Sequence, residues 1–419
     1  MGEGSKLRNG LEQELSSMAR DEKVPIIVRY SPDRRIVRHK GPPAPGVQES
    51  YNYRLQPMAH MYATPGAIQA LQQDDEVVRI YRDQPVHALL DAALPIIQMP
   101  QVRSLGWDGQ GVSIAIIDTG IDPVHPDFQG RLVDMADWVG EGPVDENGHG
   151  THCAGIAAGS GASSNGRYRG VAPGASIYAA KVLRRNGSGM MSDVMAGIDW
   201  AVEQGVQIIS LSLGGPGPSD GLDALAEMCD AAVGAGVVVC AAAGNDGPAG
   251  RTVGSPGAAR MVITVGASTD QDVAAPFSSR GPTADGRAKP DILLPGHLIT
   301  APRAKGTSMG TPVDTYYTEA SGTSMATPMA AGLCALLLQM DPDLTPDEIK
   351  ERLITTAIDL GEPEYAQGRG RADALRAIQN DVSPPRSNPG GSDPPASRPG
   401  TGLGCMSSLV ANLLQGRRK

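Results

Sequence analysis

The sequence predicts an α/β protein with a mostly parallel sheet flanked by helices on both faces, preceded by a small α+β unit. The chain has 419 residues, 40% of them hydrophobic, which is enough for two or three units with a substantial core. Its many Gly and Pro residues gather between the apolar runs and in the C-terminal tail. Between residues 91 and 380, near-continuous apolar runs alternate with helical windows, a pattern typical of parallel strands covered on both sides.

The N-terminal part of the chain divides into two predicted segments. Residues 1–20 are mostly polar and predict a weakly helical leader. Residues 21–90 predict the small α+β unit, because strand-like runs at 24–30 and 76–81 enclose a short helical window at 66–71. This unit is too small to hold much of the core, so the main domain must follow it.

The main body, residues 91–380, is expected to hold five strands with helices between them. In an open parallel sheet, the side chains that follow the strands meet at the carboxyl edge, where active sites form. The expected strands cover 112–117, 176–182, 206–211, 237–242 and 262–265, and the intervening helices cover 192–204 and 221–235.

The C-terminal part of the chain predicts no packed structure. Residues 381–404 are rich in Pro, Gly and Ser, a composition typical of a disordered linker. Residues 405–419 form a short, partly apolar segment with a basic end. A floppy C-terminal tail is favoured there over a docking helix.

The charge balance and the cysteines exclude several classes of function. A formal net charge of −10 argues against nucleic acid or a membrane surface as the main partner. Five widely spaced cysteines indicate free thiols, and without a C-x-x-C pair we expect no structural zinc. The chain shows neither an uninterrupted membrane-spanning run nor the apolar core of a secretory signal. We therefore expect a cytoplasmic protein, while export by another route stays open.

Ser324 stands in Gly322-Thr-Ser-Met-Ala-Thr-Pro328, directly before an apolar run that ends at Met340. The run predicts a buried helix, and Pro328 is expected in its first turn, where a missing N–H is tolerated. The dipole and the free N–H groups of a helix start favour a nucleophile whose reaction builds negative charge. The same motif is typical of an ordinary Ser or Thr helix cap, so the choice depends on partners elsewhere in the chain.

Three other clusters follow predicted strands or glycine-rich turns and offer those partners. Asp118 ends the first strand in Ile-Ile-Asp-Thr-Gly, and His149 stands in Asn-Gly-His-Gly-Thr-His-Cys. A serine nucleophile needs a base, and the base needs a buried carboxylate to orient it and stabilise its charged form. Asn245, in Ala-Ala-Gly-Asn, offers an amide donor for an oxyanion. Each cluster alone also fits a cap, a loop or a turn, but the four together indicate one active site.

These four motifs, in this order, resemble the signatures of the subtilisin family of serine proteases over about residues 92–380. The resemblance implies a subtilisin-like fold and a serine endopeptidase that needs no cofactor or metal for catalysis. It implies that Asp118 orients His149, which acts as base and then as acid. Ser324 attacks the peptide carbonyl, and Asn245 with the Ser324 N–H binds the oxyanion.

The resemblance also implies how substrate is bound. Protein or peptide substrates are expected to lie as an added strand between two segments, and Gly254 matches the floor of the primary specificity pocket. A floor without a side chain would admit a large apolar residue. The two segments are Gly187, Ser188, Gly189 and Ser212, Leu213, Gly214.

The small N-terminal unit resembles the inhibitory propeptide of the family, so we expect a zymogen that cuts itself between about residues 85 and 95. Its own propeptide would then be a partner of the mature enzyme. Cys153, four residues after His149, is expected to be a small core residue beside the site. The segment Gly217–Gly221 matches the esterase pattern Gly-x-Ser-x-Gly, but it lies in a Pro-rich stretch and is interpreted as a turn.

Two features depart from the pattern of the family. Asp127 matches a position that ligates calcium in many members, but the companion loop 159–169 differs from theirs, so a structural calcium ion stays open. Residues 301–319 are longer than in the compact secreted members and predict an exposed loop, which resembles the intracellular bacterial branch.

Two other functions stay open at this point. A non-cleaving scaffold or binding protein could use the same fold, although four intact site residues speak against it. An esterase or a peptide ligase could use the same triad with a different acceptor, which the sequence does not reveal.

Overall fold

The structure is a computed structural model that describes residues 6–8, 11, 15, 18–31, 45–52, 58–82 and 90–381. The chain separates into two compact units, residues 1–87 and 88–419. The division falls close to the expected end of the small unit. The predicted linker and tail, from residue 382 onward, lie outside the described residues.

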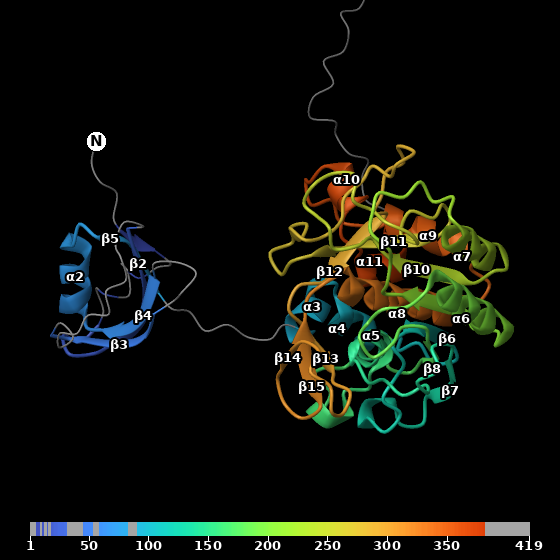
Figure 1. The fold of residues 1–419 in the computed structure, drawn as a ribbon, viewed down its shortest axis with the longest axis horizontal. Coiled ribbons are helices and arrows are strands. Elements are labelled where there is room, and N and C mark those ends of the chain that lie inside the picture. Colours follow the sequence, from blue (N-terminus) through green and yellow to red (C-terminus); the bar gives the residue numbers. More distant parts are fainter. Residues whose placement is uncertain are drawn as a thin grey trace, which may run out of the picture. The chain divides into compact units, whose positions relative to one another are not determined.

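The smaller unit is a five-stranded sheet in the order β1-β5-β2-β4-β3, and its helix α2 lies entirely within the described residues (Figure 1). Thr64 caps α2 by accepting the Ala67 N–H, and Pro65 takes the first helical position. Ile68 of α2 packs into the same core as Ile26 and Val28, so the predicted α+β character is confirmed. The elements are β1 (Leu7–Arg8), β2 (Val24–Tyr30), β3 (Val47–Asn52), β4 (Met58–Ala63), α2 (Pro65–Gln73) and β5 (Val77–Arg82).

The described residues of the segment 1–20, predicted as a weakly helical polar leader, belong to the smaller unit. Leu7–Arg8 pairs as a parallel strand with β5, and Leu7 and Leu11 are buried in the core of the smaller unit. Leu15 and Met18 pack against the same core. Leu11, Leu15 and Met18 are spaced three or four residues apart, the spacing of one face of a helix, although the residues between them are polar.

The larger unit is built on a seven-stranded parallel sheet in the order β12-β11-β10-β9-β6-β8-β7. All five predicted strands are present, and the edge strands β7 and β12 were missed. In β7 every third residue is an aspartate, which breaks the apolar run, while β12 has four residues and ends in a proline. The strands are β6 (Ser113–Asp118), β7 (Leu132–Asp137), β8 (Ser176–Lys181), β9 (Ile208–Leu211), β10 (Val238–Ala242), β11 (Ile263–Ser268) and β12 (Ile292–Pro295).

Helices cover both faces of this sheet, which confirms the predicted fold class (Figure 1). Successive residues of β6 alternate between two cores: Ile114 and Ile116 face the core formed with α5 and α8, whereas Ala115 and Ile117 face that of α6 and α7. The helices are α3 (Leu90–Ile96), α4 (Met99–Ser104), α5 (His149–Ala158), α6 (Met191–Glu203), α7 (Ala224–Gly234), α8 (Thr323–Met340), α9 (Pro346–Thr355), α10 (Glu364–Gln367) and α11 (Ala374–Gln379), with the short turns η1 (Pro126–Phe128) and η2 (Ala162–Ser164).

The segment 301–319, predicted as an exposed loop, forms part of a second, antiparallel sheet. It consists of β13 (Ile299–Pro302), β14 (Thr311–Pro312) and β15 (Tyr317–Ala320) in the order β13-β15-β14. The prediction holds for the connecting residues, which are largely exposed, but Tyr317 is fully buried. Gly, Pro and Thr residues obscure the strand pattern, and long-range pairing forms the sheet.

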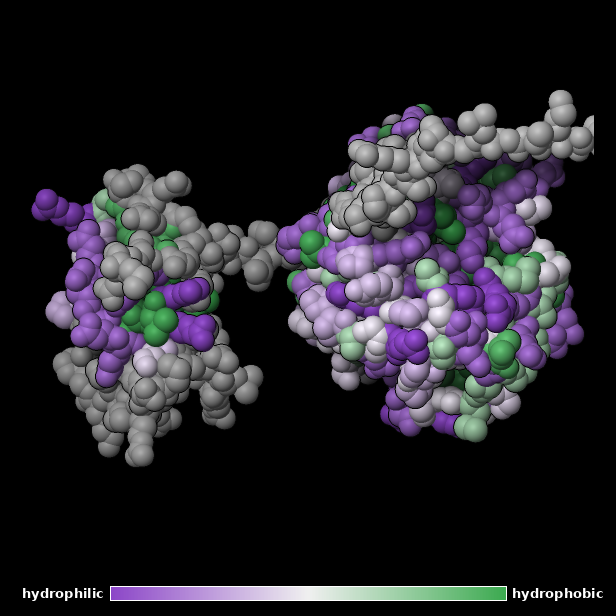
Figure 2. Space-filling view, turned by 90° about the horizontal axis from the view of Figure 1, so that it is seen from above, coloured by the Kyte–Doolittle hydropathy of each residue, from purple (hydrophilic) through white to green (hydrophobic). Residues whose placement is uncertain are grey.

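Within the described residues, α8 is the one helix long and apolar enough to cross a membrane by length and composition, and 89% of that stretch is buried inside the larger unit. Its apolarity is therefore explained by its place in the core. On the face of the larger unit seen in Figure 2, hydrophilic residues predominate and hydrophobic ones are scattered.

Candidate active site

The predicted site residues come together at the carboxyl edge of the parallel sheet. Asp118 is the last residue of β6, Ser212 follows β9, and Asn245 follows β10. These three strands are neighbours in the sheet, so the residues that follow them lie side by side. His149 begins α5 and Ser324 lies in the first turn of α8, the two helices that pack on the same face.

Asp118 and His149 form a direct hydrogen bond. His149 Nδ1 donates to Asp118 Oδ1 over 2.7 Å, and the Thr119 N–H donates to the same oxygen. The Asp118 side chain is buried, whereas that of His149 is 23% exposed, so the ring can reach a ligand. Gly150 permits this contact, because a Cβ there would lie 2.1 Å from the Gly120 carbonyl oxygen.

Asp145 holds the turn that presents His149, and sequence analysis gave it no role. It is buried, and its Oδ1 accepts hydrogen bonds from Gly148 N–H and Thr119 Oγ1. Its Oδ2 accepts from the N–H and the hydroxyl of Thr151. An acid four residues before the histidine, in a turn without apolar residues, was the signal that could have revealed this role.

The two histidines of α5 differ in their protonation. Burial opposes a charge on His149, but the Asp118 carboxylate outweighs it and raises the pKa of His149 well above 6.5. Burial and the neighbouring His149 lower the pKa of His152 to about 4. His152 Nε2 donates to the carbonyls of Ile299 and Thr318, which ties α5 to the antiparallel sheet.

The helix that carries the serine starts earlier than the sequence predicts. Because α8 begins at Thr323, Pro328 lies in its second turn and not in the first. In that position the missing proline N–H would have bonded to the carbonyl of Ser324, four residues earlier. The freed Ser324 oxygen accepts instead from Ser212 Oγ at 3.0 Å and from Cys153 Sγ at 3.4 Å.

Ser324 Oγ donates to the Ser212 carbonyl oxygen over 3.0 Å. Within the part of the chain that the structure describes, no hydrogen bond joins it to His149. Cys153, buried as expected, contacts both residues: its Sγ lies 3.9 Å from His149 Nδ1 and 3.4 Å from the Ser324 carbonyl oxygen. In unliganded active sites the bond between nucleophile and base often forms only with substrate. Asp118, His149 and Cys153 are also the one group of possible metal ligands among the described residues.

Asn245 is oriented by Thr323, a residue whose role the sequence analysis missed. Asn245 Oδ1 accepts from the N–H of Thr323 at 2.9 Å and from its hydroxyl at 3.2 Å. Since the amide oxygen faces these donors, Nδ2 is left free to donate elsewhere. Among the described residues the Ser324 N–H has no acceptor, so two free donors lie beside the serine hydroxyl.

Two adjoining cavities contain the residues expected to bind substrate. The larger, about 460 Å³, is lined by the segments 187–189 and 212–214, by His149 and by several apolar side chains. The smaller, about 290 Å³, contains Gly254 together with Asn245 and Ser324. A Cβ on Gly254 would lie 2.1 Å from the Gly215 carbonyl oxygen, so this wall has no room for a side chain.

The Gly217–Gly221 segment is a loop, as interpreted from the sequence, and Ser219 Oγ donates to Asp223, the N-cap of α7. Asp127 is buried in η1, where both carboxylate oxygens accept from N–H and O–H donors. Calcium requires six to eight oxygen ligands around it. The residues around Asp127 therefore do not fit a calcium ion.

Comparison with known proteins shows extensive similarity. Residues 109–376 match the model of the subtilase family. The chain is 44% identical over 317 residues to serine protease AprX of Bacillus subtilis, covering 69% of this chain and 72% of that protein. It is 37% identical to subtilisin E of the same organism, covering 75% and 78%. The crystal structure of a cold adapted subtilisin-like serine proteinase superimposes with a TM-score of 0.51 at 34% identity, covering 64% of this chain and 88% of that one.

The contact between Asp118 and His149 predicts a measurable difference between the two histidines. In NMR titrations, the pKa of His149 should lie above 6.5 and fall in Asp118→Asn, because the carboxylate is what raises it. His152 serves as the internal control and should stay neutral down to about pH 4. A His149 pKa that is unchanged by Asp118→Asn contradicts the assigned contact.

Proposed function

The chain belongs to the subtilase family and is a subtilisin-like serine endopeptidase, and from that premise we propose that Asp118, His149 and Ser324 form its catalytic triad. The observation that carries the proposal is the 2.7 Å hydrogen bond between His149 and the buried Asp118, beside the start of α8. Its substrates are proteins or peptides.

In the proposed reaction, Ser324 Oγ turns from the Ser212 carbonyl to His149 Nε2. As Oγ bonds to the carbonyl carbon of the substrate, its proton passes to Nε2, and Asp118 stabilises the imidazolium. His149 then gives this proton to the leaving amine as the peptide C–N bond breaks, which leaves an acyl-enzyme. Water then hydrolyses the acyl-enzyme: His149 takes a proton from the water as the water oxygen bonds to the acyl carbon. The bond from that carbon to Ser324 Oγ breaks, His149 returns the proton to Oγ, and the acid product leaves.

The oxyanion of the tetrahedral intermediate is proposed to accept hydrogen bonds from Asn245 Nδ2 and the Ser324 N–H. Both donors are held before substrate arrives, since Thr323 orients Asn245 and the helix start orients Ser324. Donors held in this way lose no energy to reorganisation during the reaction. In subtilisin the corresponding amide is worth about 10²–10³ in kcat.

Peptide substrate is proposed to extend between the segments 187–189 and 212–214, which both line the larger cavity. The residue before the cleaved bond would enter the smaller cavity, past Ser324 and toward Gly254. A wall without a side chain leaves room for a large apolar residue there.

A non-cleaving scaffold on the same fold is the alternative, and a fluorophosphonate probe separates the two. After removal of the N-terminal unit, wild type should be labelled and Ser324→Ala should not, because the probe reacts with an activated serine. Ser219→Ala is the matched control and should be labelled like wild type, since Ser219 lies in the unrelated Gly-x-Ser-x-Gly turn. If the wild-type protein without its N-terminal unit is not labelled, the scaffold is favoured.

The proposed role of Gly254 is tested by replacing it with alanine, which adds the smallest side chain. Gly254→Ala places a methyl group against the Gly215 carbonyl, so kcat/KM for a peptide with Phe before the cleaved bond should fall about 10- to 200-fold relative to one with Ala. The measured quantity is kcat/KM for the Phe peptide divided by kcat/KM for the Ala peptide, in wild type and in Gly254→Ala. An equal loss for both would show that Gly254 does not set specificity.

We propose that the enzyme is made as a zymogen, with its N-terminal unit as propeptide and inhibitor. The helix α3 begins at Leu90, and its Ala93 and Leu94 are buried in the core of the larger unit. We therefore expect self-cleavage on the N-terminal side of Leu90, within the range 85–95 predicted from the sequence. N-terminal sequencing should find this start in wild type and the uncut chain in Ser324→Ala. Cleavage of Ser324→Ala at the same bond in a host lacking other proteases contradicts self-processing.

We further propose that the enzyme acts in the cytoplasm. Four cysteines are buried free thiols, and the Sγ atoms of Cys240 and Cys334 lie 3.9 Å apart without a disulfide. Free thiols in such proximity are typical of proteins in reducing compartments. Fractionation of the source cells should place the protein with cytoplasmic markers, and its accumulation in the medium of intact cells would contradict this.

A further inference from the structure

The buried carboxylate of Asp127 connects the three segments that carry the proposed triad. Asp127 lies in η1, which follows β6 and Asp118 along the chain. Gly161 and Ser163 follow α5, the helix that His149 begins, and Tyr317 lies in β15, which leads into α8 and Ser324. We call these four residues the Asp127 junction.

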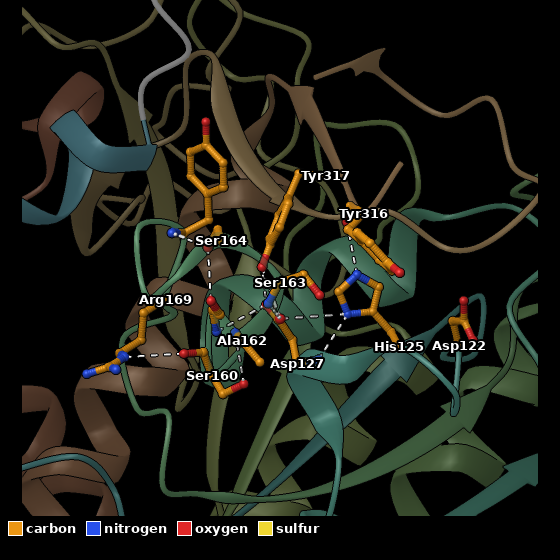
Figure 3. Close-up of polar contacts among 12 residues, drawn as sticks. Asp122, His125, Asp127, Ser160, Ala162, Ser163, Ser164, Arg169, Tyr316 and Tyr317 are labelled. Atoms are coloured by element: carbon orange, nitrogen blue, oxygen red, sulfur yellow. Dashed lines mark hydrogen bonds and ion pairs between the residues drawn. The ribbon is translucent and has the colours of Figure 1, made fainter. Parts of the chain in front are cut away.

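The hydrogen bonds of the Asp127 junction satisfy the whole carboxylate (Figure 3). Tyr317 Oη donates from 3.0 Å to each of the two carboxylate oxygens. The Gly161 N–H donates to Oδ2 at 3.2 Å and the Ser163 N–H to Oδ1 at 3.3 Å. Asp127 and Tyr317 are both fully buried, so water does not compete for these bonds.

The residues around the junction complete it. The Asp127 N–H donates to His125 Nδ1, and His125 Nε2 donates to the Tyr316 carbonyl at 2.9 Å, a second link between η1 and the antiparallel sheet. The Asp127 carbonyl accepts from the Ser160 N–H and the Arg131 guanidinium. Arg131 therefore supplies the nearby positive charge that a buried carboxylate requires.

The chemistry of the loop 159–169 decides what this carboxylate can bind. A cation site needs oxygen atoms directed inward, whereas this loop directs two N–H groups at the carboxylate. Tyr317 occupies the remaining side with a hydroxyl that donates its proton. Burial raises the pKa of Tyr317 above its usual value, so the hydroxyl keeps that proton at ordinary pH.

We propose that the Asp127 junction takes the place of a bound metal cation, and that Tyr317 is a positioning residue for the triad. The loop 159–169 directs N–H groups at the carboxylate where a cation would need oxygen ligands, and the segment 301–319 supplies the hydroxyl that holds the loop without an ion. The alignment of α5 with the start of α8 becomes independent of calcium.

The calcium part of the proposal is tested by thermal unfolding of Ser324→Ala, which removes self-digestion. Its unfolding midpoint should be the same in excess EGTA and in millimolar calcium. A calcium-induced rise that disappears when Asp127→Asn is added overturns the proposal, because the ion would then bind at Asp127. If the Asp127→Asn variant keeps the full calcium-induced rise of the unfolding midpoint, the ion binds at another site and the proposal is supported.

The positioning part rests on the proposed triad, and it is tested with Tyr317→Phe. Loss of the hydroxyl leaves a buried carboxylate short of a donor, and we expect kcat per titrated active site to fall about tenfold. KM should change little, because the substrate segments lie on other elements. The neighbouring, exposed Tyr316→Phe is the matched control and should keep wild-type kcat.

Two results would overturn the positioning role. If Tyr317→Phe lowers only the unfolding midpoint or the fraction of titratable sites, with kcat per site unchanged, the residue is merely structural. If Tyr316→Phe lowers kcat equally, the effect belongs to the sheet as a whole. Failure of the triad itself appears separately, as absence of fluorophosphonate labelling in the wild type or as labelling that survives Ser324→Ala.

Discussion

Burying a carboxylate costs free energy unless hydrogen-bond donors surround it, and three buried carboxylates hold together the segments that form the candidate active site. Asp118, Asp127 and Asp145 have almost no exposed surface. Each accepts hydrogen bonds from other segments of the larger unit: His149 for Asp118, Thr119 and Thr151 for Asp145, and Tyr317 with the loop after α5 for Asp127. The need to satisfy these charges aligns β6, α5 and the approach to α8, so the geometry of the site follows from it.

The start of α8 shows the same principle with a backbone group. Pro328 withholds the N–H that would have bonded to the Ser324 carbonyl, and Ser212 and Cys153 supply donors in its place. Those two residues come from the end of β9 and from the helix of His149. Because Pro328 leaves the Ser324 carbonyl without its helical donor, this carbonyl can accept hydrogen bonds from Ser212, in the segment 212–214, and from Cys153, in α5.

Local patterns in the sequence predicted much of this structure. The central strands and both intervening helices follow from hydrophobic periodicity, and Asp118, His149 and Asn245 were found because each follows a strand or opens a glycine-rich turn. The edge strands β7 and β12 and the antiparallel sheet were missed, because polar or short strands gain their stability from pairing partners distant in sequence. Pro328 was expected in the first turn of the helix and lies in the second, since the tertiary donors that permit an interior proline have no local signature.

The sequence by itself determined the parallel α/β fold, the order of the four site motifs and membership in a family, because these depend on residue type and spacing. Tertiary structure decided which donors reach which acceptors. Only the folded chain shows that Thr323 orients Asn245, that Ser324 Oγ donates to the Ser212 carbonyl, and that Tyr317 donates to the Asp127 carboxylate. Hydrogen bonds require atoms about 3 Å apart in the right direction, and no spacing along the chain specifies that.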